Sequence, residues 1–97
     1  MKIAYAPRAL RDLQSIADYL QSRNPQGSSR VLAAIKATIE TLASLPHIGV
    51  TLDKAGHRRV PVPRYPYLIF YRISSDELFI LHIRHSARAP LDPAAEL

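Results

Sequence analysis

The chain has 97 residues, of which 47% are hydrophobic and 22% are charged, and these ordinary proportions exclude a disordered chain. It has no cysteine and no apolar run of the roughly 20 residues that cross a bilayer, which argues against a disulfide-stabilised secreted domain and a membrane protein. We therefore expect a cytoplasmic protein with a single domain over residues 1–91 and a loose tail over residues 92–97.

The net charge points to the chemistry of a partner. Thirteen Lys and Arg residues against eight Asp and Glu residues give a formal charge of +5. This charge favours an anionic partner, either nucleic acid or an acidic protein, although it also keeps a small domain soluble. Most of the cations are arginines, whose planar guanidinium suits phosphate and carboxylate groups better than an ammonium does.

The first half of the chain predicts a short edge strand over residues 2–6 and then two helices. Apolar residues recur at steps of three and four after Pro7, which suits the first turn of a helix. Asn24-Pro25 interrupts this pattern, so the first helix should end near Arg23, and Asn24 should cap a second helix that begins at Pro25. The second helix stops before Pro46, and the two form an antiparallel hairpin.

The second half of the chain predicts strands. Residues 46–56 form a loop, and residues 57–62 alternate between apolar and polar positions, with prolines that favour a sheet edge. Residues 67–71 and 78–83 are apolar on both faces, which is typical of central strands, and they pair across a tight turn at residues 74–76. The order β-α-α-β-β-β predicts an α+β fold in which the helical hairpin packs on a small, mainly antiparallel sheet.

Strict alternation predicts which strand residues share a face. Tyr67, Ile69 and Tyr71 fall on one face of the first central strand, and Phe79, Leu81 and Ile83 on one face of the second. One helical hairpin covers only one face of a sheet. We therefore expect the other face to be apolar and available to a partner, unless sheet twist and the loop cover it.

Five short motifs follow one another along the chain. They are Asp12-Leu13 with Ile16 and Tyr19-Leu20, Asn24-Pro25, Leu42 with Leu45-Pro46 and Gly49, Tyr65-Pro66-Tyr67, and His85 with Arg88. Their order and spacing resemble the RelE/ParE superfamily of type II toxin–antitoxin toxins, and most closely its ParE-like branch. The resemblance covers residues 1–90, and it departs from many relatives at Gly49-Val50, where those carry Gly-Arg.

The resemblance implies a growth-inhibiting toxin that forms a hetero-oligomer with a cognate antitoxin, ParD-like or other. ParE-like members are associated with inhibition of DNA gyrase, whereas RelE-like members cleave messenger RNA on the ribosome. We expect gyrase to be the target, with RNA cleavage as the alternative. A non-toxic nucleic-acid-binding module, using tyrosines to stack bases, is a second alternative. No cofactor or metal is implied.

The candidate residues differ for each function. Cleavage needs a proton acceptor, a proton donor and cations around the phosphate, and the candidates are Arg64, Arg72, Arg84, His85 and Arg88. Because Arg84 and His85 alternate across a strand and no tyrosine follows Tyr71, this set argues against a nuclease. For binding a target we expect Arg64, Arg84, His85 and Arg88, and for binding the antitoxin Leu13, Ile16, Leu20, Val31 and Ile35.

The other histidines carry weaker expectations. His47 and His57 flank the predicted loop, where a histidine is usually solvated and idle. His82 lies among apolar strand residues, and we expect it to have a structural role.

Overall fold

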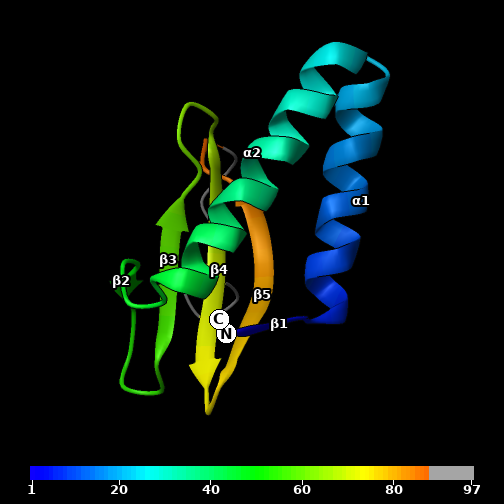
Figure 1. The fold of residues 1–97 in the computed structure, drawn as a ribbon. Coiled ribbons are helices and arrows are strands. Elements are labelled where there is room, and N and C mark those ends of the chain that lie inside the picture. Colours follow the sequence, from blue (N-terminus) through cyan, green and yellow to red (C-terminus); the bar gives the residue numbers. More distant parts are fainter. Residues whose placement is uncertain (88–97) are drawn as a thin grey trace.

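The computed structural model describes residues 1–87, in which two helices and five strands follow one another (Figure 1). They are β1 (Lys2–Tyr5), α1 (Pro7–Gln21), α2 (Pro25–Ser44), β2 (Val50–Thr51), β3 (His57–Pro61), β4 (Tyr67–Ser74) and β5 (Glu77–His85). The predicted α+β fold is confirmed, with the short strand β2 added inside the expected loop. The expected tail over residues 92–97 lies outside the described residues.

Proline and asparagine set the helix boundaries. Pro7 begins α1 and Pro25 begins α2, at positions where the missing N–H would have no partner within the helix. The Asn24 side chain accepts a 2.9 Å hydrogen bond from the Gly27 N–H, so the predicted N-cap is confirmed. α1 ends at Gln21, close to the predicted boundary.

The strands form one mixed sheet in the order β1-β5-β4-β3-β2. β1 runs parallel to β5, and the other three pairs are antiparallel, including the predicted β4–β5 hairpin. β1 lies at an edge of the sheet, as expected. Its register sets Lys2 opposite Glu77 and Tyr5 opposite Ile80, so the first strand of the chain pairs with the last.

Both helices lie on one face of the sheet, which Figure 1 shows from the helix side. The core between these two layers consists of Ala9, Val31, Ile35, Ile39, Leu42, Val62, Tyr67, Ile69, Tyr71, Leu78, Ile80 and Ile83. Tyr67, Ile69 and Tyr71 therefore share the helix-covered face, as their alternation predicts. We call the sheet face opposite the helices the distal face.

A β-bulge in β5 changes which of its residues share a face. Adjacent residues of β4 pair with Ile80 and His82, which leaves Leu81 as an inserted residue. Ile80 and Ile83 consequently both enter the core, although three positions separate them. The prediction that Ile83 shares a face with Phe79 and Leu81 is wrong, because strict alternation holds only where no residue is inserted.

Tyr71 ties the loop between α2 and β2 to the sheet. Its hydroxyl donates to the Pro46 carbonyl at 2.8 Å and accepts from the Gly49 N–H at 2.9 Å. A Cβ atom on Gly49 would collide with the Tyr71 side chain, so glycine alone fits there. Arg58 adds a 2.9 Å hydrogen bond to the Gly49 carbonyl. Burial raises the pKa of the Tyr71 phenol, against the opposing effects of the Gly49 N–H and the Arg58 charge.

Candidate functional site

The residues expected to bind a target gather at one end of the sheet. Arg64 lies in the exposed turn between β3 and β4, with φ of 73°, a left-handed conformation that is unfavourable for a residue with a side chain. Arg84 and His85 end β5 beside this turn, because His85 pairs with Tyr67, the first residue of β4. The fourth candidate, Arg88, lies outside the described residues.

Arg84 and His85 point to opposite sides of the sheet. The His85 ring makes an edge-on contact with Tyr67 on the helix side, with 5.2 Å between ring centroids. Its Nδ1 accepts a 3.2 Å hydrogen bond from the Ala87 N–H, which leaves the proton of the neutral ring on Nε2. Arg84 lies opposite Leu68 on the distal face. The register therefore confirms the prediction that Arg84 and His85 alternate across the strand.

Arg72 lies on the distal face, in the middle of the sheet. Its guanidinium carbon is 5.7 Å from the centroid of the Phe79 ring. Its Nε is buried and has no hydrogen-bond partner among the described residues. Arg84 and His85 both line a pocket of about 180 Å³ beside α1, whereas Arg72 lies outside it in the middle of the distal face. The candidates for RNA cleavage therefore do not all meet at one point.

An aspartate holds His57 in a fixed orientation. Nδ1 of His57 lies 2.7 Å from Oδ2 of Asp53, whose Oδ1 accepts hydrogen bonds from the backbone N–H groups of Ala55 at 2.9 Å and His57 at 3.2 Å. Partial burial alone would raise the pKa of Asp53, but these hydrogen bonds and the charge of His57 lower it below its ordinary value. The carboxylate therefore orients the ring with Nδ1 toward Asp53 and Nε2 away from it.

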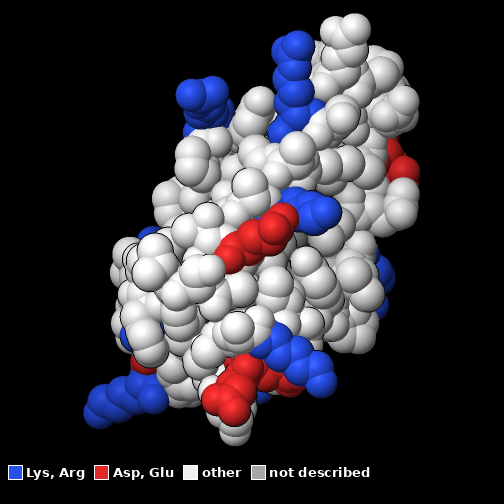
Figure 2. Space-filling view, viewed as in Figure 1, with Lys and Arg blue, Asp and Glu red and all other residues white. Residues whose placement is uncertain are grey.

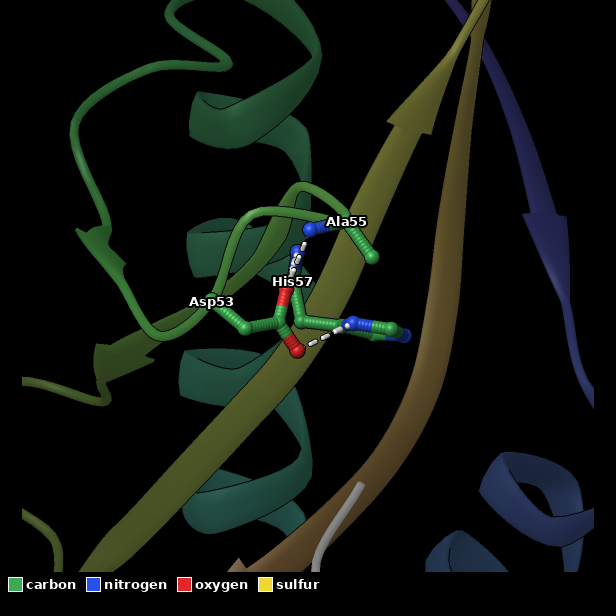
Figure 3. A network of polar contacts seen from close by, with 3 residues as sticks. All are labelled: Asp53, Ala55 and His57. Carbon is green, nitrogen blue, oxygen red and sulfur yellow. Dashed lines mark hydrogen bonds and ion pairs between the residues drawn. The ribbon is translucent and has the colours of Figure 1, made fainter.

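The Asp53–His57 pair was missed by the sequence interpretation. His57 is the first residue of β3, where the predicted strand begins, and Figure 3 shows its ring in front of strands that have α2 behind them, which places it on the distal face. The spacing Asp-x-x-x-His across a turn is the signal that could have identified the pair. Arg72 is the cross-strand neighbour of His57, so a cation lies beside this oriented imidazole.

The distal face carries a mixture of cations and aromatic rings. Phe70 and His82 stack on it with 4.2 Å between centroids and an interplanar angle of 7°. They are 1% and 2% exposed, in keeping with the structural role expected of His82. Arg59 lies opposite Phe70, two pairs along from His57. The apolar distal face predicted from the sequence is therefore wrong, because arginines alternate with the apolar residues.

An apolar groove opens on the helix side. It has a volume of about 500 Å³ and is lined by Tyr5, Leu10, Leu13, Gln14, Ala17, Leu32, Ile35, Lys36 and Ile39. Leu10, which the sequence interpretation did not select, is 54% exposed there. Leu13, Ile16 and Leu20 are half-buried. Val31 and Ile35, expected to be incompletely covered, are only 6% and 1% exposed and offer a partner almost no surface.

Metal-binding clusters and membrane-spanning helices are both absent from residues 1–87. Within that range no three His, Asp or Glu side chains gather in a way that could hold a metal ion. Neither of the two helices there has the length and apolar character needed to cross a membrane.

Comparison with known proteins matches residues 3–90 to the family described as the ParE toxin of the type II toxin–antitoxin system parDE. The chain belongs to the ParE toxin family. Two curated toxins of Caulobacter vibrioides are similar along most of their length. RelE2 is 32% identical over 90% of this chain and 97% of its own, and RelE3 is 31% identical over 87% and 92%.

A solved structure supports the fold assigned to this ParE family member. It is described as the chromosomal ParDE TA system from P. aeruginosa, and one of its chains superimposes with a TM-score of 0.76. The match covers 88% of this chain and 95% of the other, at 22% sequence identity. As a ParE toxin, the chain has an antitoxin as its partner.

Proposed function

We propose that this toxin inhibits growth by binding DNA gyrase. The observation that carries the proposal is that its cations are spread over the sheet, since Arg64 lies in the β3–β4 turn and Arg72 in the middle of the distal face, both outside the pocket that Arg84 and His85 line. General acid–base catalysis needs groups that converge within hydrogen-bond reach of one scissile bond. A binding inhibitor needs only a shaped surface of suitable charge, and diverging cations supply that over a wider area.

We also propose that the antitoxin covers the apolar groove on the helix side. Figure 2 shows mostly uncharged surface on this side of the molecule, with a red and a blue group side by side near the middle, and Leu10 and Leu13 expose apolar surface in the groove. An exposed apolar patch of this kind is typical of a partner site. The candidate Leu20 lies further along α1 and would extend the contact, whereas Ile16 lines a separate pocket with Tyr67 and Ile83.

The experiment that tests the target combines two measurements. RNA ends are mapped in cells soon after the toxin is induced, and supercoiling by purified gyrase is assayed with purified toxin. We expect intact ribosome-bound messages and inhibited gyrase. Reversing Arg64, Arg84 and Arg88 to Glu should relieve inhibition while the protein stays folded, because surface reversals usually change stability by less than about 0.5 kcal/mol. Early cleavage inside codons with unaffected gyrase would contradict the proposal.

One observation favours RNA cleavage as the second candidate. The Asp53–His57 pair beside Arg72 offers an oriented proton acceptor and a cation for a phosphate on the distal face. If this toxin is a ribonuclease, His57→Gln should abolish cleavage, and Asp53→Asn should weaken it by releasing the ring. His47→Gln, a change in an exposed loop histidine, is the matched control and should cleave normally.

A further inference from the structure

A second groove lies between α2 and the β3–β4 turn. Its volume is about 540 Å³, and its lining residues on α2 include Ala33, Ala37 and Thr41, which follow one another at steps of four and are all exposed. Pro63, Arg64 and Tyr65 belong to the opposite wall. The exposed helix wall is therefore a ridge of small side chains, which lets the backbone of a partner approach closely.

The charged groups of this groove are all cationic. The Thr38 and Thr41 hydroxyls already donate to the carbonyls of Ala34 and Ala37, at 2.8 and 3.0 Å. The charged residues of the lining are Arg30 and Arg64, and the lining contains no acid.

The charged surface around the groove agrees with this lining. Glu40 is on the same helix but outside the lining. Figure 2 shows cations projecting above α2 and the β3–β4 turn with no acidic surface between them. An approaching carboxylate therefore meets positive charge at this end of the groove.

The backbone of Arg64 adds an independent observation. Its φ of 73° lies in the left-handed region, which glycine or asparagine would occupy at lower cost. The turn is nevertheless filled by a long cation that lines the groove. A strained position that presents a charged side chain to a groove is typical of a binding residue.

We infer that this groove binds an acidic helical segment of the protein that the toxin inhibits. This inference rests on the proposed function in one respect, that the toxin acts by binding. Residues 30–41 of α2 span about 16 Å, the length of three turns of a partner helix. Two arginines beside an apolar ridge suit carboxylates on an amphipathic helix better than the dense phosphates of a nucleic acid, which call for an array of cations.

The test uses three full-length variants. Ala37→Leu fills the groove, and Ser29→Leu adds the same side chain at an exposed position of α2 outside it. Arg64→Gly removes the cation and relieves the left-handed strain, so its melting temperature should equal or exceed that of the wild type. Growth inhibition, inhibition of purified gyrase, antitoxin affinity and solution mass are measured for each protein.

We expect Ala37→Leu and Arg64→Gly to lose at least tenfold in inhibition, with unchanged antitoxin affinity, while Ser29→Leu behaves as the wild type. Full inhibition by both groove variants overturns the inference. The inference also fails if the groove variants lose only their affinity for the antitoxin, or only a toxin dimer that the wild type forms, because either result assigns the groove to another occupant. If the wild type stops growth without affecting gyrase, the gyrase target fails, and loss of growth inhibition in the groove variants still supports the groove. If the wild type inhibits neither growth nor gyrase, both proposals fail.

Discussion

The Tyr71 hydroxyl connects the loop after α2 to the middle of the sheet. It satisfies the Gly49 N–H and the Pro46 carbonyl, so Tyr71→Phe leaves a buried donor without its partner. We expect a loss of about 1–3 kcal/mol in the free energy of unfolding, measured in urea. Tyr65→Phe is the control, because no described residue bonds the Tyr65 hydroxyl. Equal stability of the two variants would contradict the role given to Tyr71.

The Asp53 carboxylate makes a stability contribution that depends on pH. Its pKa is lower in the folded chain than the ordinary value of 3.8, so the ionised form favours folding. That contribution is complete above the ordinary value and is lost as the pH falls through the lowered one. We expect Asp53→Asn to destabilise the protein at neutral pH, by an amount that shrinks to nothing in strong acid. Equal destabilisation by Asp53→Asn at neutral pH and in strong acid would contradict this contribution.

Among the elements, the starts of the two helices could be predicted from the sequence, because they depend on local residues. Pro7, Asn24 and Pro25 act through their own backbone or side chain, and the structure begins both helices where they indicate. The bulge at Leu81 has no such signal, because it arises from how β5 fits between β1 and β4. The pairing of His57 with Arg72 also has no local signal, since it depends on the register between β3 and β4.

The N-cap of α2 gives a prediction at this scale. Asn24→Ala removes the acceptor of the Gly27 N–H at the start of the second helix. It should lower the free energy of unfolding by about 1 kcal/mol. Gln26→Ala, at an exposed position in the same first turn, is the control and should change stability little. Chemical unfolding of the two variants side by side measures the difference, and indistinguishable midpoints would argue against the cap.

For the whole molecule, the antitoxin acts as a ligand of the folded state. A partner at 100 times its Kd raises the free energy of unfolding by about 2.7 kcal/mol. Leu10→Glu places a charge in the groove at a residue that is 54% exposed, so it should abolish this gain without unfolding the toxin. Leu45→Glu, at a residue 56% exposed outside the groove, should keep the gain. Thermal unfolding with and without antitoxin provides the measurement, and protection of the Leu10→Glu variant would rule out the groove as the docking site.

The pairing of β1 with β5 has a consequence for biosynthesis. Lys2 lies opposite Glu77, so 75 positions separate the two partners, and the ribosome makes them in that order. A nascent chain therefore carries its first strand unpaired until about 75 further residues have been translated. Long-range pairing of this kind also slows folding. The parallel pair that holds β1 at the sheet edge can form only after all the other described helices and strands have been synthesised.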